Sequence, residues 1–173
     1  ATSQTTSDFN TIDLSGDTNS TGINVISSTD ANGITTIIGS AGVDQISVLT
    51  AAPATTVTGG LGIDTFTITA PASTVTITDL GNGNDVLTTA TSGTTNATLY
   101  LASGVVAYTP ASGTIGASTT AVLTVGAATS GTVDLNNMAN DGTLTINAPT
   151  ATGALTLIGT SGMDSVVGGT GND

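Results

Sequence analysis

The segment Gly59-Gly60-Leu61-Gly62-Ile63-Asp64-Thr65-Phe66-Thr67 indicates the architecture of the whole chain. It reads glycine, glycine, any residue, glycine, any residue, aspartate, any residue, a bulky apolar residue and any residue. This is the nonapeptide signature of a calcium-binding parallel β-helix. Glycine tolerates positive φ, so the backbone can turn sharply with its carbonyls inward. Asp64 adds an anionic oxygen, the ligand type that Ca²⁺ prefers, and Phe66 is expected to enter the apolar interior.

Four further segments repeat this pattern in whole or in part. Residues 39–47 have serine in place of the second glycine, and residues 159–167 have threonine there. Residues 81–87 keep two of the glycines, the aspartate and the apolar residue, and residues 168–173 stop on the aspartate. The expected metal ligands are the turn aspartates and the carbonyls of their glycines: Asp44, Asp64, Asp85, Asp164, Asp173, Gly39, Gly42, Gly59, Gly60, Gly62, Gly81, Gly83, Gly159, Gly162, Gly168, Gly169 and Gly171.

The spacing of the aspartates predicts how the turns stack. Asp44, Asp64 and Asp85 are 20 and 21 residues apart, which is near a full coil of two nonapeptides with a few extra residues. Their turns are expected to stack along one edge, with one calcium ion between the first two turns and another between the last two. Asp164 and Asp173 are 9 residues apart, so their turns are expected on opposite sides of a coil.

A plainer interpretation is that these segments are glycine turns without metal, because glycine with Asp or Asn is ordinary turn chemistry. Five aligned segments make that interpretation the weaker one. The remaining aspartates of interest lie outside the repeats, and we expect solvated turn or strand residues there: Asp13, Asp17, Asp30, Asp79, Asp134 and Asp141.

The composition excludes several classes of function. The chain of 173 residues contains no Lys, Arg, His or Cys, and its net charge is −12. Nothing in it would neutralise the phosphates of a nucleic acid. Catalysis near neutral pH most often uses His, Cys, Lys or a tuned Glu, and Glu is missing too. We therefore expect no active site here, and no zinc or copper site of the usual His and Cys type.

Short apolar runs that alternate with threonine recur along the whole chain and predict β-strands. Threonine and valine are β-branched and suit a pleated surface. Aromatic residues make up only 2% of the chain, which favours a thin core of Val, Ile and Leu over a thick globular one. No apolar run approaches the roughly 20 residues of a membrane-spanning helix.

The predicted fold class is all-β: a parallel β-helix or β-roll solenoid with calcium-binding glycine-rich turns. Residues 1–38 supply N-terminal strands, 39–90 form a calcium β-roll, and 159–173 begin a second calcium block. Residues 91–158 contain predicted strands without repeat turns. They either continue the solenoid, which we favour, or form a small β-sandwich, because regular strand spacing is compatible with both.

Over residues 39–90 and 159–173 the chain resembles the RTX (repeats-in-toxin) family of secreted bacterial proteins. The segment Thr76–Leu80, which leads into the Asp85 turn, also looks like the way blocks of this family commonly close. The resemblance implies calcium-driven folding outside the cell, export by a type I secretion system and a place at the bacterial cell surface. The family includes toxins, secreted proteases and lipases, adhesins and crystalline surface-layer proteins.

Two functions fit these expectations. In the first, the chain is a structural segment of an extracellular self-assembling surface-layer or sheath protein, folded and cross-linked by Ca²⁺. The Thr, Ala, Gly and Asp composition and the long stretch without repeats favour it. In the second, it is a calcium-folded repeat segment of a type I-secreted adhesin or enzyme whose activity lies elsewhere.

The expected partners are copies of the same chain, and a cell-surface polysaccharide is a further candidate. The first residue is not Met and the last lies within a repeat, so we expect a piece of a longer protein.

Replacing Asp64 with alanine is predicted to weaken calcium binding more than the same change at Asp44 or Asp85. The Asp64 turn would touch both proposed ions, whereas each of the other two turns would touch one. Isothermal titration calorimetry with calcium chloride measures the effect. Full calcium affinity in the Asp64→Ala variant would contradict a turn shared between two ions.

Overall fold

The computed structural model describes residues 10–19, 23–28, 34–49, 54–69, 74–89, 95–101, 107–117, 119–125 and 131–173. Within these ranges all regular secondary structure is β-strand, and there is no helix of the length and apolarity that crossing a membrane requires. The strands are β1 (Thr11–Asp13), β2 (Ile23–Ser28), β3 (Thr36–Ile38), β4 (Val43–Val48), β5 (Thr55–Thr58), β6 (Thr65–Ile68), β7 (Thr74–Leu80), β8 (Val86–Thr89), β9 (Thr95–Leu101), β10 (Ala107–Tyr108), β11 (Gly113–Ile115), β12 (Thr119–Thr124), β13 (Gly131–Asp134), β14 (Met138–Asn140), β15 (Thr143–Asn147), β16 (Leu155–Ile158) and β17 (Asp164–Val167).

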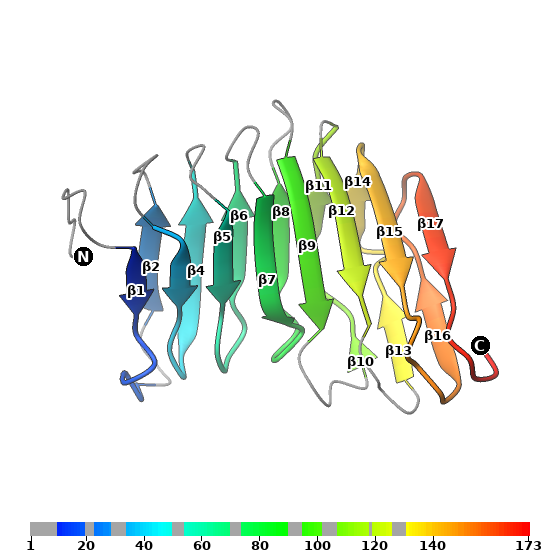
Figure 1. Ribbon diagram of the computed structural model, residues 1–173, viewed down its shortest axis with the longest axis horizontal. Helices are drawn as coiled ribbons and strands as arrows, with labels where there is room; N and C mark the ends of the chain where they lie inside the picture. The colour runs from blue at the N-terminus through cyan, green and yellow to red at the C-terminus, as the bar shows by residue number, and fades with distance from the viewer. Residues whose placement is uncertain are drawn as a thin grey trace.

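These strands form three parallel sheets that wind into a solenoid (Figure 1). Sheet A has the order β1-β3-β5-β7-β9-β12-β15-β17, sheet B the order β14-β11-β8-β6-β4-β2, and sheet C the order β10-β13-β16. The predicted all-β parallel solenoid is thus confirmed. The described residues within 91–158 continue it in parallel pairings and do not form a separate sandwich.

The strand register gives the length of each coil, by which we mean one full circuit of the chain. Thr36 pairs with Thr56, and Thr56 pairs with Thr76, so the two coils from β3 to β7 are 20 residues long. Asn96 pairs with Thr120, so the coil that begins in β9 is 24 residues long. The coils from β9 to β12 and from β12 to β15 visit sheet C as well as sheets A and B, so their cross-section has three sides where the coils from β3 to β7 have two.

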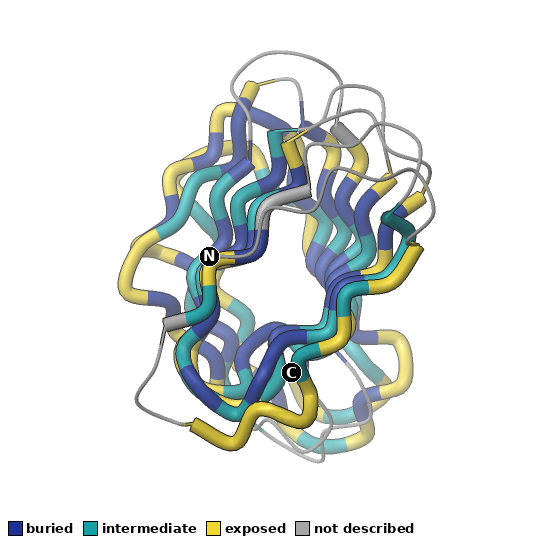
Figure 2. Tube along the Cα trace, turned by 90° about the vertical axis from the view of Figure 1, so that its left-hand side faces the viewer, coloured by how far each residue is buried: buried dark blue, intermediate teal, exposed yellow. Residues whose placement is uncertain are grey.

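One column of apolar side chains runs along the inner side of sheet A. Alternation along each strand directs these side chains inward and the intervening threonines outward. Figure 2 looks along the solenoid and shows the coils stacked in register around this core. The six central members of the column are at most 2% exposed. In register order the column consists of Ile12, Ile37, Val57, Ile77, Leu99, Leu123, Ile146 and Val166.

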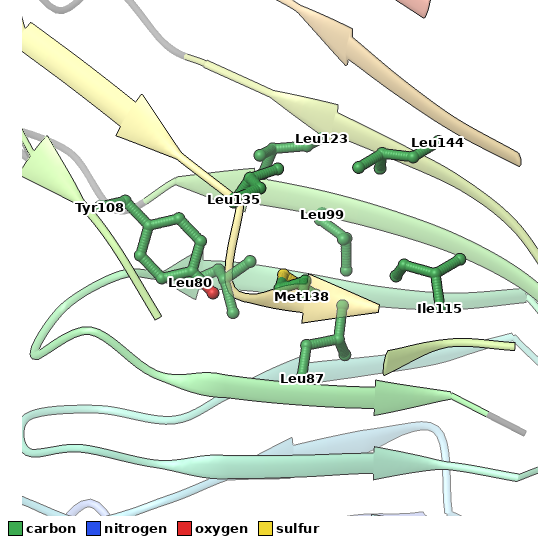
Figure 3. A pocket seen from close by; sticks show the side chains of 9 residues that line it. All are labelled: Leu80, Leu87, Leu99, Tyr108, Ile115, Leu123, Leu135, Met138 and Leu144. Carbon is green, nitrogen blue, oxygen red and sulfur yellow. The ribbon is translucent and has the colours of Figure 1, made fainter. Parts of the chain in front are cut away.

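Larger side chains fill the interior where the coil widens. Tyr108 is 1% exposed, and its hydroxyl donates to the main-chain carbonyl of Asp85 at 2.9 Å. Leucines and Met138 surround a cavity of about 10 Å³ beside it (Figure 3). This volume is at the lower limit for one water molecule, and the lining is apolar, so the cavity is a gap in packing rather than a ligand pocket.

The glycine turns stack with the main chain of one coil pressed against the next. A β-carbon on Gly62 would lie 2.5 Å from the carbonyl oxygen of Gly42, and one on Gly83 would collide with the carbonyl oxygen of Gly62. The φ angles of Gly62 and Gly83 are 109° and 124°. Close stacking and positive φ therefore both require glycine here, whether or not a metal binds.

Replacing Gly62 with alanine is predicted to destabilise the protein. A residue other than glycine costs about 1–3 kcal/mol at such a φ, and the Gly42 carbonyl blocks the new β-carbon. Gly16→Ala is the matched control, because a β-carbon on Gly16 meets nothing within 4 Å. Urea denaturation measures both variants, and equal stability of the two would contradict the stacking contact.

Candidate metal site

The turns that contain Asp44, Asp64 and Asp85 stack at the edge where strands of sheet A pass into sheet B. They follow β3, β5 and β7 and precede or open β4, β6 and β8. The three residues are only 0–1% exposed. We call these three side chains the carboxylate column. The structure thus brings together the three aspartates that the 20-residue and 21-residue intervals had placed on one edge.

Main-chain N–H groups hold the column together. The N–H of Asp44 donates to Oδ1 of Asp64 at 2.8 Å, and the N–H of Asp64 donates to Oδ1 of Asp85 at 2.8 Å. Two of the side chains also close their own turns. Oδ2 of Asp44 accepts the Ser40 N–H at 2.6 Å, and Oδ2 of Asp85 accepts the Gly81 N–H at 2.9 Å.

Asp64 differs from its two neighbours in the column. Its Oδ2 accepts no hydrogen bond from any residue that the structure describes. The Gly60 N–H, which occupies the place of the Ser40 N–H one coil earlier, donates instead to Oδ2 of Asp79 at 2.8 Å. A carboxylate oxygen buried without a partner is unfavourable unless a proton or a cation compensates it.

Asp79 is a residue of the candidate site that the sequence analysis did not identify. We expected a solvated side chain, but Asp79 is half-buried and accepts the N–H groups of both Gly59 and Gly60, at 2.9 and 2.8 Å. The pairing of β7 with β9 shifts between Ile77 and Leu80, and such a bulge re-aims side chains. The sequence feature that could have indicated this role is the position of Asp79, two residues before Gly81.

The other aspartates outside the repeats play local roles. Asp13 accepts the Ser15 N–H at 2.9 Å, and Asp134 accepts the Asn136 N–H at 3.1 Å. Asp17 likewise accepts the N–H of Asn19, two residues further along the chain. Asp141 is exposed. Asp30 lies outside the described residues.

Burial dominates the electrostatics of the column. It raises the pKa of Asp64 to about 7 and the pKa of Asp85 to about 6, because water no longer solvates the charge. The negative charges of Asp85, Asp44 and Asp79 raise the pKa of Asp64 further, and that of Asp79 raises the pKa of Asp85. Hydrogen bonds from main-chain N–H groups only partly offset these effects. The chain has no basic side chain, so near neutral pH only a proton or an external cation can balance the column.

The two C-terminal turns lie at opposite ends of β17 (Figure 1). Asp164 opens β17, and its Oδ1 accepts the Asn140 side-chain amide at 3.1 Å. Asp173 lies beyond the other end of β17, and its Oδ1 accepts the Leu155 N–H at 3.3 Å. Each turn thus packs on the preceding coil, but the two carboxylates do not form a column and are less buried than the first three.

The donors on the column are oxygens, which suits Ca²⁺. However, no three His, Cys, Asp or Glu side chains converge on one metal position within the described ranges. An ion on the column would therefore need main-chain carbonyls as well as carboxylates. The carbonyl oxygens of Gly42 and Gly62 face the next turn and are candidates for this role. The residues fit a calcium ion best at the unpaired oxygen of Asp64.

Comparison with known proteins gives no relative. No protein-family model, no curated protein and no solved structure matches the chain. The resemblance to RTX repeats is therefore carried by the turn residues alone.

The metal-free protein is predicted to lose stability as the pH rises from about 5 to about 8. Asp in an unfolded chain has a pKa of about 3.9, whereas the folded values are about 7 for Asp64 and about 6 for Asp85. The folded protein therefore binds more protons than the unfolded chain in this range. The resulting stabilisation is complete below the unfolded pKa and is lost as the pH passes through the folded values.

Thermal melting in calcium-free buffer measures this dependence. Asp64→Asn should reduce it, because the amide does not titrate. Asp141→Asn removes the same charge from an exposed turn and should leave the dependence unchanged. A melting temperature that stays constant across this pH range in the unsubstituted protein would contradict the prediction.

Proposed function

We propose that this chain is a structural, non-catalytic segment of an extracellular surface-layer or sheath protein that Ca²⁺ folds and cross-links. The observation that carries the proposal is the buried carboxylate column with the unpaired Oδ2 of Asp64. In a chain without Lys, Arg or His, an external cation is the natural counter-charge.

The side chains of Asp44, Asp64 and Asp85, together with carbonyls of their turns, would hold the metal. When bound, Ca²⁺ supplies the positive charge that lets neighbouring buried carboxylates remain ionised. The main-chain bonds already align the turns, so the ligands are positioned before an ion arrives. An ion that binds only the folded chain shifts the folding equilibrium by mass action.

The same column also supports the proposal that the chain folds only after export from the cell. At low calcium concentration and neutral pH the buried carboxylates oppose folding, because their ionised forms repel one another and lose solvation. Outside the cell, a higher calcium concentration would remove this opposition. We propose type I secretion and a location at the bacterial cell surface on these grounds and on the resemblance of the turns.

The regular solenoid surface supports a structural role. Threonines stand in register on the outer side of sheet A, as in the series Thr36, Thr56, Thr76 and Thr98. The cavity of about 10 Å³ in the core is too small and too apolar to bind a substrate. A rod with a repeating surface can contact further copies of itself through equivalent positions.

Calcium is predicted to stabilise the folded chain cooperatively. Far-UV circular dichroism and thermal melting follow the β signal during a titration with calcium chloride and its reversal with EGTA. At a free calcium concentration of about 100 times Kd, one ion adds about 2.7 kcal/mol of stability. Mg²⁺ at the same concentration is the control, because it demands a tighter octahedral geometry.

Calcium-driven folding would be contradicted if neither the spectrum nor the melting temperature changed when calcium or EGTA was added. Electron microscopy of the calcium-loaded protein then tests the second part of the proposal. Ordered sheets or fibres are expected with calcium and should disappear with EGTA. Calcium-loaded protein that stays monomeric at all concentrations would count against the lattice role.

A further inference from the structure

The Asp44 turn and the Asp64 turn satisfy their leading N–H groups in different ways. In the first, the Gly39 N–H donates to the Thr58 carbonyl and the Ser40 N–H donates to Asp44 itself. In the second, the Gly59 and Gly60 N–H groups both donate to Asp79. Asp79 thus takes over the donor that would otherwise bind Asp64, and leaves Oδ2 of Asp64 free.

The next coil also binds the carbonyl group of Gly60. The side-chain amide of Asn82 donates to the Gly60 carbonyl at 2.6 Å. Gly60 is therefore held through its N–H by Asp79 and through its carbonyl by Asn82. The equivalent carbonyl one coil earlier, that of Ser40, accepts the longer main-chain bond from Leu61 at 3.1 Å and no side-chain bond from the described residues. The Asp44 turn is held differently, through the Ser40 hydroxyl, which bonds both carboxylate oxygens of Asp44 and accepts the Gly42 N–H.

Asp79 also adds negative charge to one interval of the column. Its carboxylate bonds the Gly59 and Gly60 N–H groups of the Asp64 turn, and Asp79 itself lies two residues before Gly81 of the Asp85 turn, so this charge lies between the two turns. The interval between the Asp64 and Asp85 turns therefore has three nearby carboxylates. Calcium affinity rises with the negative charge at the site.

We propose that Asp79 makes the two cation positions on the column unequal, so that the interval between the Asp64 and Asp85 turns binds calcium first and more tightly. This inference rests on the proposed function. Asp79 is a positioning residue rather than a ligand, because both of its carboxylate oxygens already accept main-chain N–H groups. It acts by holding Gly59 and Gly60, by freeing Oδ2 of Asp64 and by adding charge.

Calorimetric titration with calcium chloride tests the inference in three proteins. The unsubstituted chain is expected to bind with one stronger and one weaker phase at the column. In Asp79→Asn the stronger phase should weaken about 10–100-fold, the usual effect of losing a residue that supports a metal ligand. Asp141→Asn loses the same charge from an exposed turn and should titrate like the unsubstituted chain.

The outcomes separate this inference from the proposed function. If the unsubstituted chain binds no calcium, the proposed function fails. If it binds calcium and Asp79→Asn titrates like Asp141→Asn, the inference fails and the proposed function stands.

Amide hydrogen exchange at Gly59 and Gly60 gives a readout that does not depend on calcium. Both amides should exchange faster in Asp79→Asn, while the Ser40 amide, which binds Asp44, should not change. If Asp79→Asn does not fold at saturating calcium, Asp79→Glu carries the test. It keeps the charge and should retain a distinct stronger phase, and two equally weak phases would overturn the inference.

Discussion

Contact between the main chain of one coil and the glycine of the next is the constraint on which this structure depends. The carbonyls of Gly42 and Gly62 occupy the space that a side chain on the following turn would need. At the corners of the solenoid, the turns of successive coils can therefore lie as close together as its paired strands do. Only at that distance can the carboxylate of Asp64 reach the N–H of Asp44. The apolar column of sheet A and the carboxylate column are two results of the same close stacking.

That stacking has an electrostatic consequence, because it removes the aspartates from water without giving them a basic partner. Main-chain N–H groups satisfy most of their oxygens. They do not neutralise the charge, and the raised pKa values of Asp64 and Asp85 record the remaining deficit. In the proposed function a cation compensates this negative charge. Its binding therefore changes the stability of the fold and not the course of the chain.

Much of the fold could be predicted from the sequence, because its signals are periodic. Alternating threonine and apolar residues indicate strands, and the intervals between Asp44, Asp64 and Asp85 match one coil. The change to coils that include sheet C could not be predicted, since no motif marks the point where Tyr108 enters the core. The role of Asp79 was hidden for a similar reason, because it arises from a shift in pairing with β9, a strand further along the chain. Calcium itself remains a prediction.

The direction of the hydrogen bonds also determines how such a rod responds to force. The strands run across the long axis of the solenoid, so the bonds between coils lie along that axis (Figure 1). Tension applied along the axis loads the few bonds of one coil boundary at a time, and the rod peels open coil by coil, because each coil contacts only its neighbours. Tension applied along the strands loads many bonds together in shear. A segment of this kind is therefore compliant in one direction and stiff in the other, and its orientation within an assembly would set which of the two properties the assembly has.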